Sequence, residues 1–124
     1  MPKKRQGFDV VLNAARALPD VEPSTTWGAS ALKAGGKLLA CQAIHKSAEP
    51  NSIVVKIGMD QRAELIAAEP DVYYVTDHYV NFPSVLVRLP RIHADALRDL
   101  LAMSWRFAHE RKAAKSRGRR TSRR

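Results

Sequence analysis

The hydrophobic and polar positions of the chain follow two periods, and the clearest helical one lies near the C-terminus. Six residues there recur at the spacing of one helix face, in a helix expected to begin near Ala94: Leu97, Leu100, Leu101, Ser104, Trp105 and Ala108. Residues 7–18 show the same three- and four-residue spacing, and Pro19 ends that helix. A shorter helix is expected from Asp60, as its N-cap, through Ala68. The pattern therefore predicts three helices.

Between these helices, apolar and polar residues alternate as they do in strands. Six segments are predicted as strands: residues 25–27, 31–33, 37–41, 53–57, 72–75 and 85–89. Gly35 and Gly36 separate two of them and accept positive φ without steric cost, which predicts a hairpin. Residues 20–24 read as a polar turn and residues 47–51 as a polar loop. This order favours a two-layer α+β sandwich, an antiparallel sheet with helices packed on one face.

Composition places this fold in one domain. The chain has 124 residues, 45% of them hydrophobic, and a single cysteine, Cys41, so an intrachain disulfide is excluded. No apolar run approaches the length of about 18 residues that a membrane span needs. The basic opening has no apolar stretch behind it, so we expect no signal peptide. We expect a cytoplasmic protein, with the monomer as the favoured state and no membrane partner.

Positive charge is concentrated at the two ends of the chain. Residues 108–124 carry eight basic side chains against one acid, Glu110, and the N-terminal segment adds Lys3, Lys4 and Arg5. Removing this net +7 and +3 from the chain's +9 leaves residues 6–107 with a charge of −1. The layout divides the chain into a basic extension (1–6), an α+β domain (7–107) and a basic tail (108–124). We expect the last helix to end near Gly118.

Several segments appear in an order that resembles one family. They are residues 17–22 (ALPDVE), Trp27-Gly28, residues 33–40 (KAGGKLLA), residues 76–79 (TDHY), residues 83–89 (PSVLVRL) and the stretch from Leu97 to Trp105. Together they resemble the MmcQ/YjbR family of small bacterial proteins, over most of residues 8–108. The resemblance implies an α+β fold similar to the frataxin/CyaY-like sandwiches. Members are often labelled DNA-binding, and the resemblance brings no catalytic residues with it.

The chain departs from the commonest pattern of that family after His78. The usual Leu-Asn-Lys and a following Trp are replaced by Tyr79-Val80-Asn81 and Phe82-Pro83-Ser84. Any function that the family's Lys and Trp carry therefore does not transfer to these positions. The segment resembles instead a subgroup of the family in which the two motifs read His-Tyr and Pro-x-Val-Leu.

The basic ends predict binding to a polyanion. The candidate nucleic-acid-binding residues are Arg111, Lys112, Lys115, Arg117, Arg119, Arg120, Arg123, Arg124, Lys3, Lys4 and Arg5. No aromatic residue follows Phe107, so the tail offers no stacking platform and its binding should be indifferent to sequence. We expect a nucleic-acid partner, with DNA favoured over RNA. The alternative is a tail that only solubilises the domain.

The domain itself offers a weaker candidate surface, made of Trp27, Lys33, Lys37, His78 and Arg88. As a functional residue, His78 would be a proton carrier or a ligand near Arg88. The other reading is structural for four of these residues: the tryptophan packs against the last helix, the lysines edge a solvated strand, and the histidine makes hydrogen bonds within a loop.

Metal and cofactor sites are not expected. Cys41 and His45 lie about 13 Å apart along an extended strand, too far to share one ion unless the chain turns between them. No cofactor motif and no catalytic constellation is present, so we expect a protein that is not an enzyme.

The sequence thus leaves three hypotheses. The first is sequence-nonspecific nucleic-acid binding through the basic ends of a neutral domain. The second is a module that binds a protein or a small ligand, with incidental tails. The third, held as the weakest, is an enzyme that uses His78.

Overall fold

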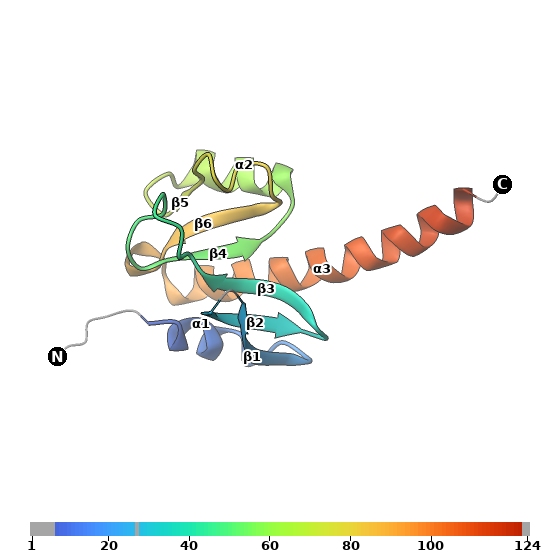
Figure 1. Cartoon of the computed structure of the whole chain (residues 1–124), viewed down its shortest axis with the longest axis horizontal. Helices are drawn as coiled ribbons and strands as arrows, with labels where there is room; N and C mark the ends of the chain where they lie inside the picture. The colour runs from blue at the N-terminus through green and yellow to red at the C-terminus, as the bar shows by residue number, and fades with distance from the viewer. Residues whose placement is uncertain (1–6, 27, 123–124) are drawn as a thin grey trace.

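The structure is a computed structural model that describes residues 7–26 and 28–122, with side chains through Glu110. Within these residues the chain forms one antiparallel sheet of order β1-β2-β3-β4-β6-β5 (Figure 1). Its strands are β1 (Val21–Thr26), β2 (Ala29–Ala34), β3 (Lys37–Gln42), β4 (Ser52–Lys56), β5 (Tyr73–Tyr74) and β6 (Ser84–Arg88). The helices are α1 (Asp9–Ala14), α2 (Met59–Ala68), the short 3-10 helix η1 (Leu89–Arg91) and α3 (Ala94–Ser122). The predicted α+β class is confirmed.

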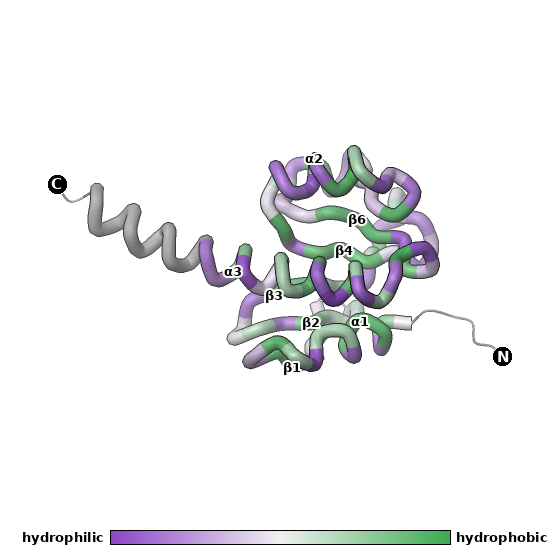
Figure 2. Tube along the Cα trace, turned by 180° about the vertical axis from the view of Figure 1, so that it is seen from behind, coloured by the Kyte–Doolittle hydropathy of each residue, from purple (hydrophilic) through white to green (hydrophobic). Residues whose placement is uncertain are grey.

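Helices α1 and α3 cover one face of the sheet, and α3 crosses the central strands β3 and β4 (Figure 2). The predicted stripe of α3 supplies Leu97, Leu100 and Leu101 to the core, each at most 2% exposed. They meet core residues from every central strand, among them Leu39, Val55 and Val85. Helix α2 flanks β5 and β6 and packs Leu65 and Ile66, both half-buried, against the same core. Burial of this apolar surface is the main force that holds the layers together.

The predicted glycine hairpin joins β2 and β3. Gly35 and Gly36 both adopt positive φ, at 56° and 82°, and the strands they connect pair antiparallel. The register shifts between Leu32 and Lys33, which leaves Leu39 as an extra residue of β3. The hydroxyl of the fully buried Ser104 in α3 donates to the carbonyl oxygen of Leu39 at 3.1 Å. A polar residue on the apolar stripe of α3 thus satisfies a backbone acceptor at this irregular point of the sheet.

The N-terminal region differs from its prediction in two ways. The helix expected over residues 7–18 is only six residues long, and the chain after Ala14 continues in tight turns, with Leu18 donating to Ala15 at 3.0 Å. The polar turn expected at residues 20–24 is confined to Asp20 (φ 63°), and β1 begins directly after it. All six residues of β1 pair with β2. Pairing with a neighbouring strand therefore overrides the weak local preference of this polar segment.

The ends of other helices and strands differ from their predicted positions by a few residues. The N-cap of α2 is Gly58, whose N–H donates to the side chain of Gln61 at 3.2 Å, and Asp60 lies in the first turn instead. Strand β5 keeps only the two tyrosines of the predicted segment, and β6 starts one residue early and gives way to η1 at Leu89.

The last helix runs past its expected end near Gly118 and continues to Ser122. Ala108, assigned to the tail from sequence, is 9% exposed and belongs to the core. The folded body therefore extends through Ala108, and all eight basic residues of the tail follow it.

Candidate functional site

The basic residues expected to bind nucleic acid lie mostly outside the described part of the chain. This holds for Lys3, Lys4 and Arg5, and for the side chains of the eight basic residues after Glu110. The backbone of the C-terminal segment is described through Ser122 as part of α3, which runs past the edge of the sheet in Figure 1. The helix joins this segment to the core without an intervening loop.

The structure separates the two lysines of the candidate surface on the domain. Lys33 pairs with Leu38 and Lys37 pairs with Ala34 across the β2–β3 hairpin. Ala34 belongs to the core cluster beneath the helices, so Lys33, one residue earlier on its strand, faces the opposite side. The pairing places Lys37 on the helix side of the sheet, at its exposed end. Trp27, the third member expected here, lies outside the described residues. The two lysines therefore do not form one surface.

The sheet face opposite α1 and α3, which we call the open face, is partly covered by two loops. Val54 and Leu86 each lie between two core residues of their strands, so their side chains point to the open face. They are nevertheless 8% and 0% exposed. The loops of residues 43–51 and 75–83, which we call the loop layer, lie on this side and contact each other through their side chains. The loop layer thus shields an apolar row of the sheet.

Arg88 fixes one end of the loop layer. Its Nε and Nη2 donate to the two carboxylate oxygens of Glu49, both at 2.8 Å, and its Nη1 donates to the carbonyls of Pro70 and Asp71. The guanidinium also lies 4.1 Å from the centre of the Tyr74 ring. The hydrogen bond from Arg88 holds the pKa of Glu49 below its usual range. These contacts occupy Arg88, so we leave it out of the nucleic-acid surface.

His78 lies in the loop of residues 75–83 and packs against the loop of residues 43–51. Its ring stacks on that of His45, with centroids 3.5 Å apart and planes at 6°, and Tyr79 meets both rings edge-on. Ser47 and Thr76 join the same two loops through a hydroxyl contact of 2.8 Å. His78 thus takes part in an aromatic contact between the two halves of the loop layer, and its imidazole is exposed on the surface.

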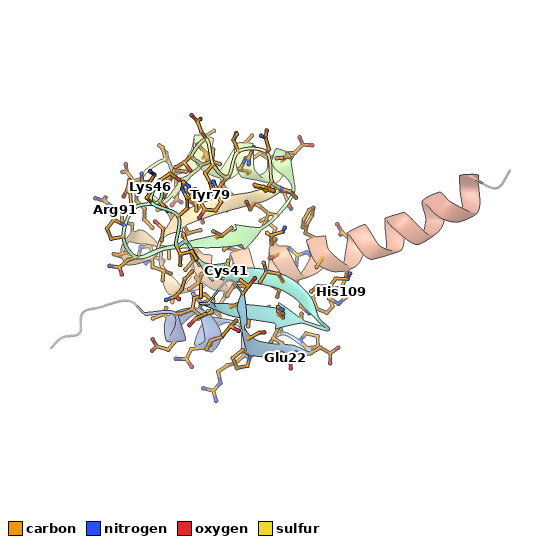
Figure 3. The ribbon with its side chains drawn as sticks, viewed as in Figure 1. Glu22, Cys41, Lys46, Tyr79, Arg91 and His109 are labelled. Carbon is orange, nitrogen blue, oxygen red and sulfur yellow. The ribbon has the colours of Figure 1, made fainter. Side chains whose placement is uncertain are left out.

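Cys41 lies on the open face below this cluster, half-buried (Figure 3). Burial raises the pKa of its thiol, and the nearby Lys56 opposes the shift without cancelling it. The thiol is therefore protonated and weakly reactive at neutral pH. Within the described part of the chain, no three His, Cys, Asp or Glu side chains come together as metal ligands. No described helix combines the length and the apolar character needed to cross a membrane.

The sequence did not identify His45, Ser47, Thr76 and Glu49 as parts of one arrangement. They come from loops separated by about 30 residues along the chain, and contacts at that distance leave no periodic signal. The backbone N–H of Ser47 donates to Nδ1 of His45, but the turn motifs with this geometry belong to Asn, Asp, Ser and Thr, so a histidine gave no local signal.

The fold and sequence together place the chain among known proteins. The model of the YjbR family matches residues 16–107, which is most of the chain and nearly all of the folded body. The protein belongs to the YjbR family, as the ordered segments of its sequence predict.

Its relatives are named without a function. The chain is 46% identical over 41 residues to the uncharacterised protein Mb2600 of Mycobacterium bovis and, equally, to the uncharacterised protein Rv2570 of Mycobacterium tuberculosis. That stretch covers 33% of this chain and about a third of the length of these relatives, 32%. The crystal structure of Deinococcus radiodurans protein DR2400, a DUF419 domain, superposes with a TM-score of 0.64 at 20% identity, over 85% of this chain and 80% of that one. This likeness concerns the fold alone.

Proposed function

We propose that this protein binds nucleic acid without sequence preference, through contacts between phosphates and its basic C-terminal segment. The observation that carries the proposal is the separation of charge: eight basic residues follow Glu110, whereas residues 6–107 are close to neutral. Such a dense block of Lys and Arg attracts a polyanion by displacing its condensed counterions. The N-terminal Lys3, Lys4 and Arg5 are three further candidate contacts. We favour DNA as the partner.

The geometry of α3 supports this proposal. The helix begins at Ala94, packs Leu97 through Ala108 into the core and continues to Ser122. An elongated basic element attached to a stable body can follow a phosphate backbone, since its attachment removes part of the ordering cost of binding. The folded domain would then serve mainly to hold and present the segment.

A second candidate is a protein-interaction module that uses the loop layer. Three large apolar side chains of these loops are exposed: Ile44 at 61%, Val80 at 38% and Phe82 at 53%. Large apolar side chains exposed on two loops that contact each other favour contact with another protein. On this hypothesis the tail is incidental, and the activity stays with the domain when the tail charge is removed.

Neutralising part of the tail in the full chain separates these candidates. Replacing Arg117, Arg119 and Arg120 by Gln should weaken binding to labelled duplex DNA by about ten- to a hundredfold at 100 mM salt, because each lost phosphate contact removes nearly one unit from the salt slope. The matched control, Lys33→Gln with Lys37→Gln, should change the affinity by less than about threefold. Fluorescence anisotropy measures both. If both variants lost the same amount of DNA affinity, the binding site would not be confined to the tail and would include the domain.

A further inference from the structure

A small apolar patch stays exposed although hydrogen bonds hold the backbone that carries it. Met59, Val80 and Phe82, which we call the Phe82 patch, are 42%, 38% and 53% exposed. Arg62 of α2 donates to the carbonyl oxygen of Val80 at 3.0 Å and to that of Phe82 at 3.1 Å. It also donates to the carbonyl oxygen of Ser84 at 3.2 Å. One guanidinium thus joins α2 to the loop that carries Val80 and Phe82.

Backbone hydrogen bonds fix the same loop on its other side. The N–H of Phe82 donates to the carbonyl oxygen of Tyr79 at 3.1 Å, and the N–H of Ile57 donates to that of Pro83, also at 3.1 Å. Ile57 is fully buried, so the residue next to Phe82 is tied directly to the core. A backbone fixed in this way loses little further freedom when a ligand covers its side chains. The ring of Phe82 therefore belongs to a preorganised surface.

The patch lies at the end of the body from which the basic segment extends. In Figure 1, β4 ends, α2 begins and β6 begins at this end. Gly58, the residue before α2, lies against the ring of Phe107 of α3: a methyl group on its Cα would stand 3.7 Å from Cε1 of that ring. Arg111, the first basic residue of the tail, follows Phe107 by about one helical turn, or about 6 Å along the axis. One elongated ligand can therefore reach both the patch and the basic segment.

Two cations border the patch, and within the part of the chain that the structure describes neither forms a salt bridge with a carboxylate. One is Arg62, which bonds only carbonyl oxygens. The other is Lys56, which pairs with Ser84 across β4 and β6 and lies between two core residues, so its side chain points to the open face. Asp60, an acid in the first turn of α2, pairs with neither cation. The surroundings of the patch thus fit a ligand that carries negative charge.

We propose that the Phe82 patch binds the unpaired bases of single-stranded nucleic acid while the basic segment holds phosphates of the same strand, an inference that rests on the proposed function. Phe82 offers a ring on which any base can stack, and Val80 and Met59 offer apolar contact beside it. A single strand satisfies both features at once, since it carries a phosphate beside every base. A duplex keeps its bases within its own stack and gains only the phosphate contacts. The patch therefore adds a preference for single strands without a preference for one sequence.

The affinities of the full chain for three labelled oligonucleotides test this inference. They are a single strand of about 15 nucleotides, a strand of the same length with an abasic site in place of every base, and a duplex. At about 100 mM salt, the wild type should bind the normal strand about five- to a hundredfold more tightly than the abasic strand, the usual effect of stacking one base on an aromatic side chain. Phe82→Leu keeps an apolar side chain without a ring. It should lose most of this difference and bind the duplex within about twofold of the wild type, because the phosphate contacts are unchanged.

Two further variants separate stacking from general apolar contact. Phe82→Trp offers a larger ring and should keep or increase the preference for the strand with bases. The matched control is Ile44→Ala, which removes an apolar side chain that is 61% exposed on the loop of residues 43–51. It should leave all three affinities within about twofold of the wild type. The substituted side chains are exposed, so these variants should fold as the wild type does.

Three outcomes overturn the proposal: equal wild-type affinities for the normal and abasic strands, a full preference that persists in Phe82→Leu, or an equal loss in Ile44→Ala. The first is also the result expected if the patch serves a protein partner. If steep salt dependence is retained, these outcomes leave the tail as the binding site and remove only the patch. Failure to bind any of the three oligonucleotides would instead overturn the proposed function, and this inference with it.

Discussion

Removing residues 111–124 is expected to lower the affinity for duplex DNA by about a hundred- to a thousandfold at 100 mM salt. The full chain, with about six phosphates neutralised, gains nearly one decade of affinity per contact at this salt relative to 1 M. Of the eleven candidate phosphate-binding residues, the shortened chain keeps only Lys3, Lys4 and Arg5, and so at most three such contacts. The cut after Glu110 preserves Ala108, which is part of the core, and His109, whose ring stacks on Trp105.

This prediction requires that the shortened domain remains folded. Its buried stripe from Leu97 to Ala108 is intact, so its free energy of unfolding in urea should be close to that of the full chain. A folded domain that binds DNA as tightly as the full chain would contradict the prediction. A folded domain that retains an interaction with another protein would instead support the loop layer as the functional surface.

Arg88→Ala is expected to reduce the free energy of unfolding by about 2–3 kcal/mol, the usual cost of losing hydrogen bonds to a charged group. The side chain of Arg88 is 21% exposed and joins the Glu49 carboxylate to the carbonyls of Pro70 and Asp71. Its removal leaves these acceptors without their donor and also frees the ring of Tyr74. Urea denaturation measures the change.

Two variants calibrate this result. Arg91→Ala removes a charge from an exposed neighbouring position and should change the stability by less than about 0.5 kcal/mol. Arg88→Lys keeps the charge but not the planar fork, and should lose most of what the alanine variant loses. Equal effects of Arg88→Ala and Arg91→Ala would mean that net charge, and not the hydrogen-bonded arrangement, is what matters.

Features that depend on residues close together in the sequence were predicted better than features that depend on contacts between distant residues. Strands β4 and β6, the Gly35-Gly36 hairpin and the buried face of α3 were predictable because their apolar period or turn chemistry is local. Only the end of β1, at Thr25 and Thr26, was predicted, because the polar residues before it become a strand only through pairing with β2. The end of α3 was also misjudged, since Gly118 is compatible with a helix that continues.

The candidate residues of the domain show the same division. Lys33 and Lys37 are close along the sequence, yet the pairing of β2 with β3 sends them to opposite faces. Arg88 and Glu49 are 39 residues apart and meet only because the sheet brings β6 beside β4. The charge of the tail could be predicted, because it is counted directly from the sequence and depends on no distant contact.

The measurement that tests the central claim most directly is the salt dependence of DNA affinity of the full chain between about 50 and 200 mM salt. If the basic segment neutralises about six phosphates, log K should fall against log salt with a slope of roughly −5, on unrelated duplex sequences alike. A slope near −1, or tight binding restricted to one sequence, would contradict electrostatic, sequence-indifferent binding by the tail.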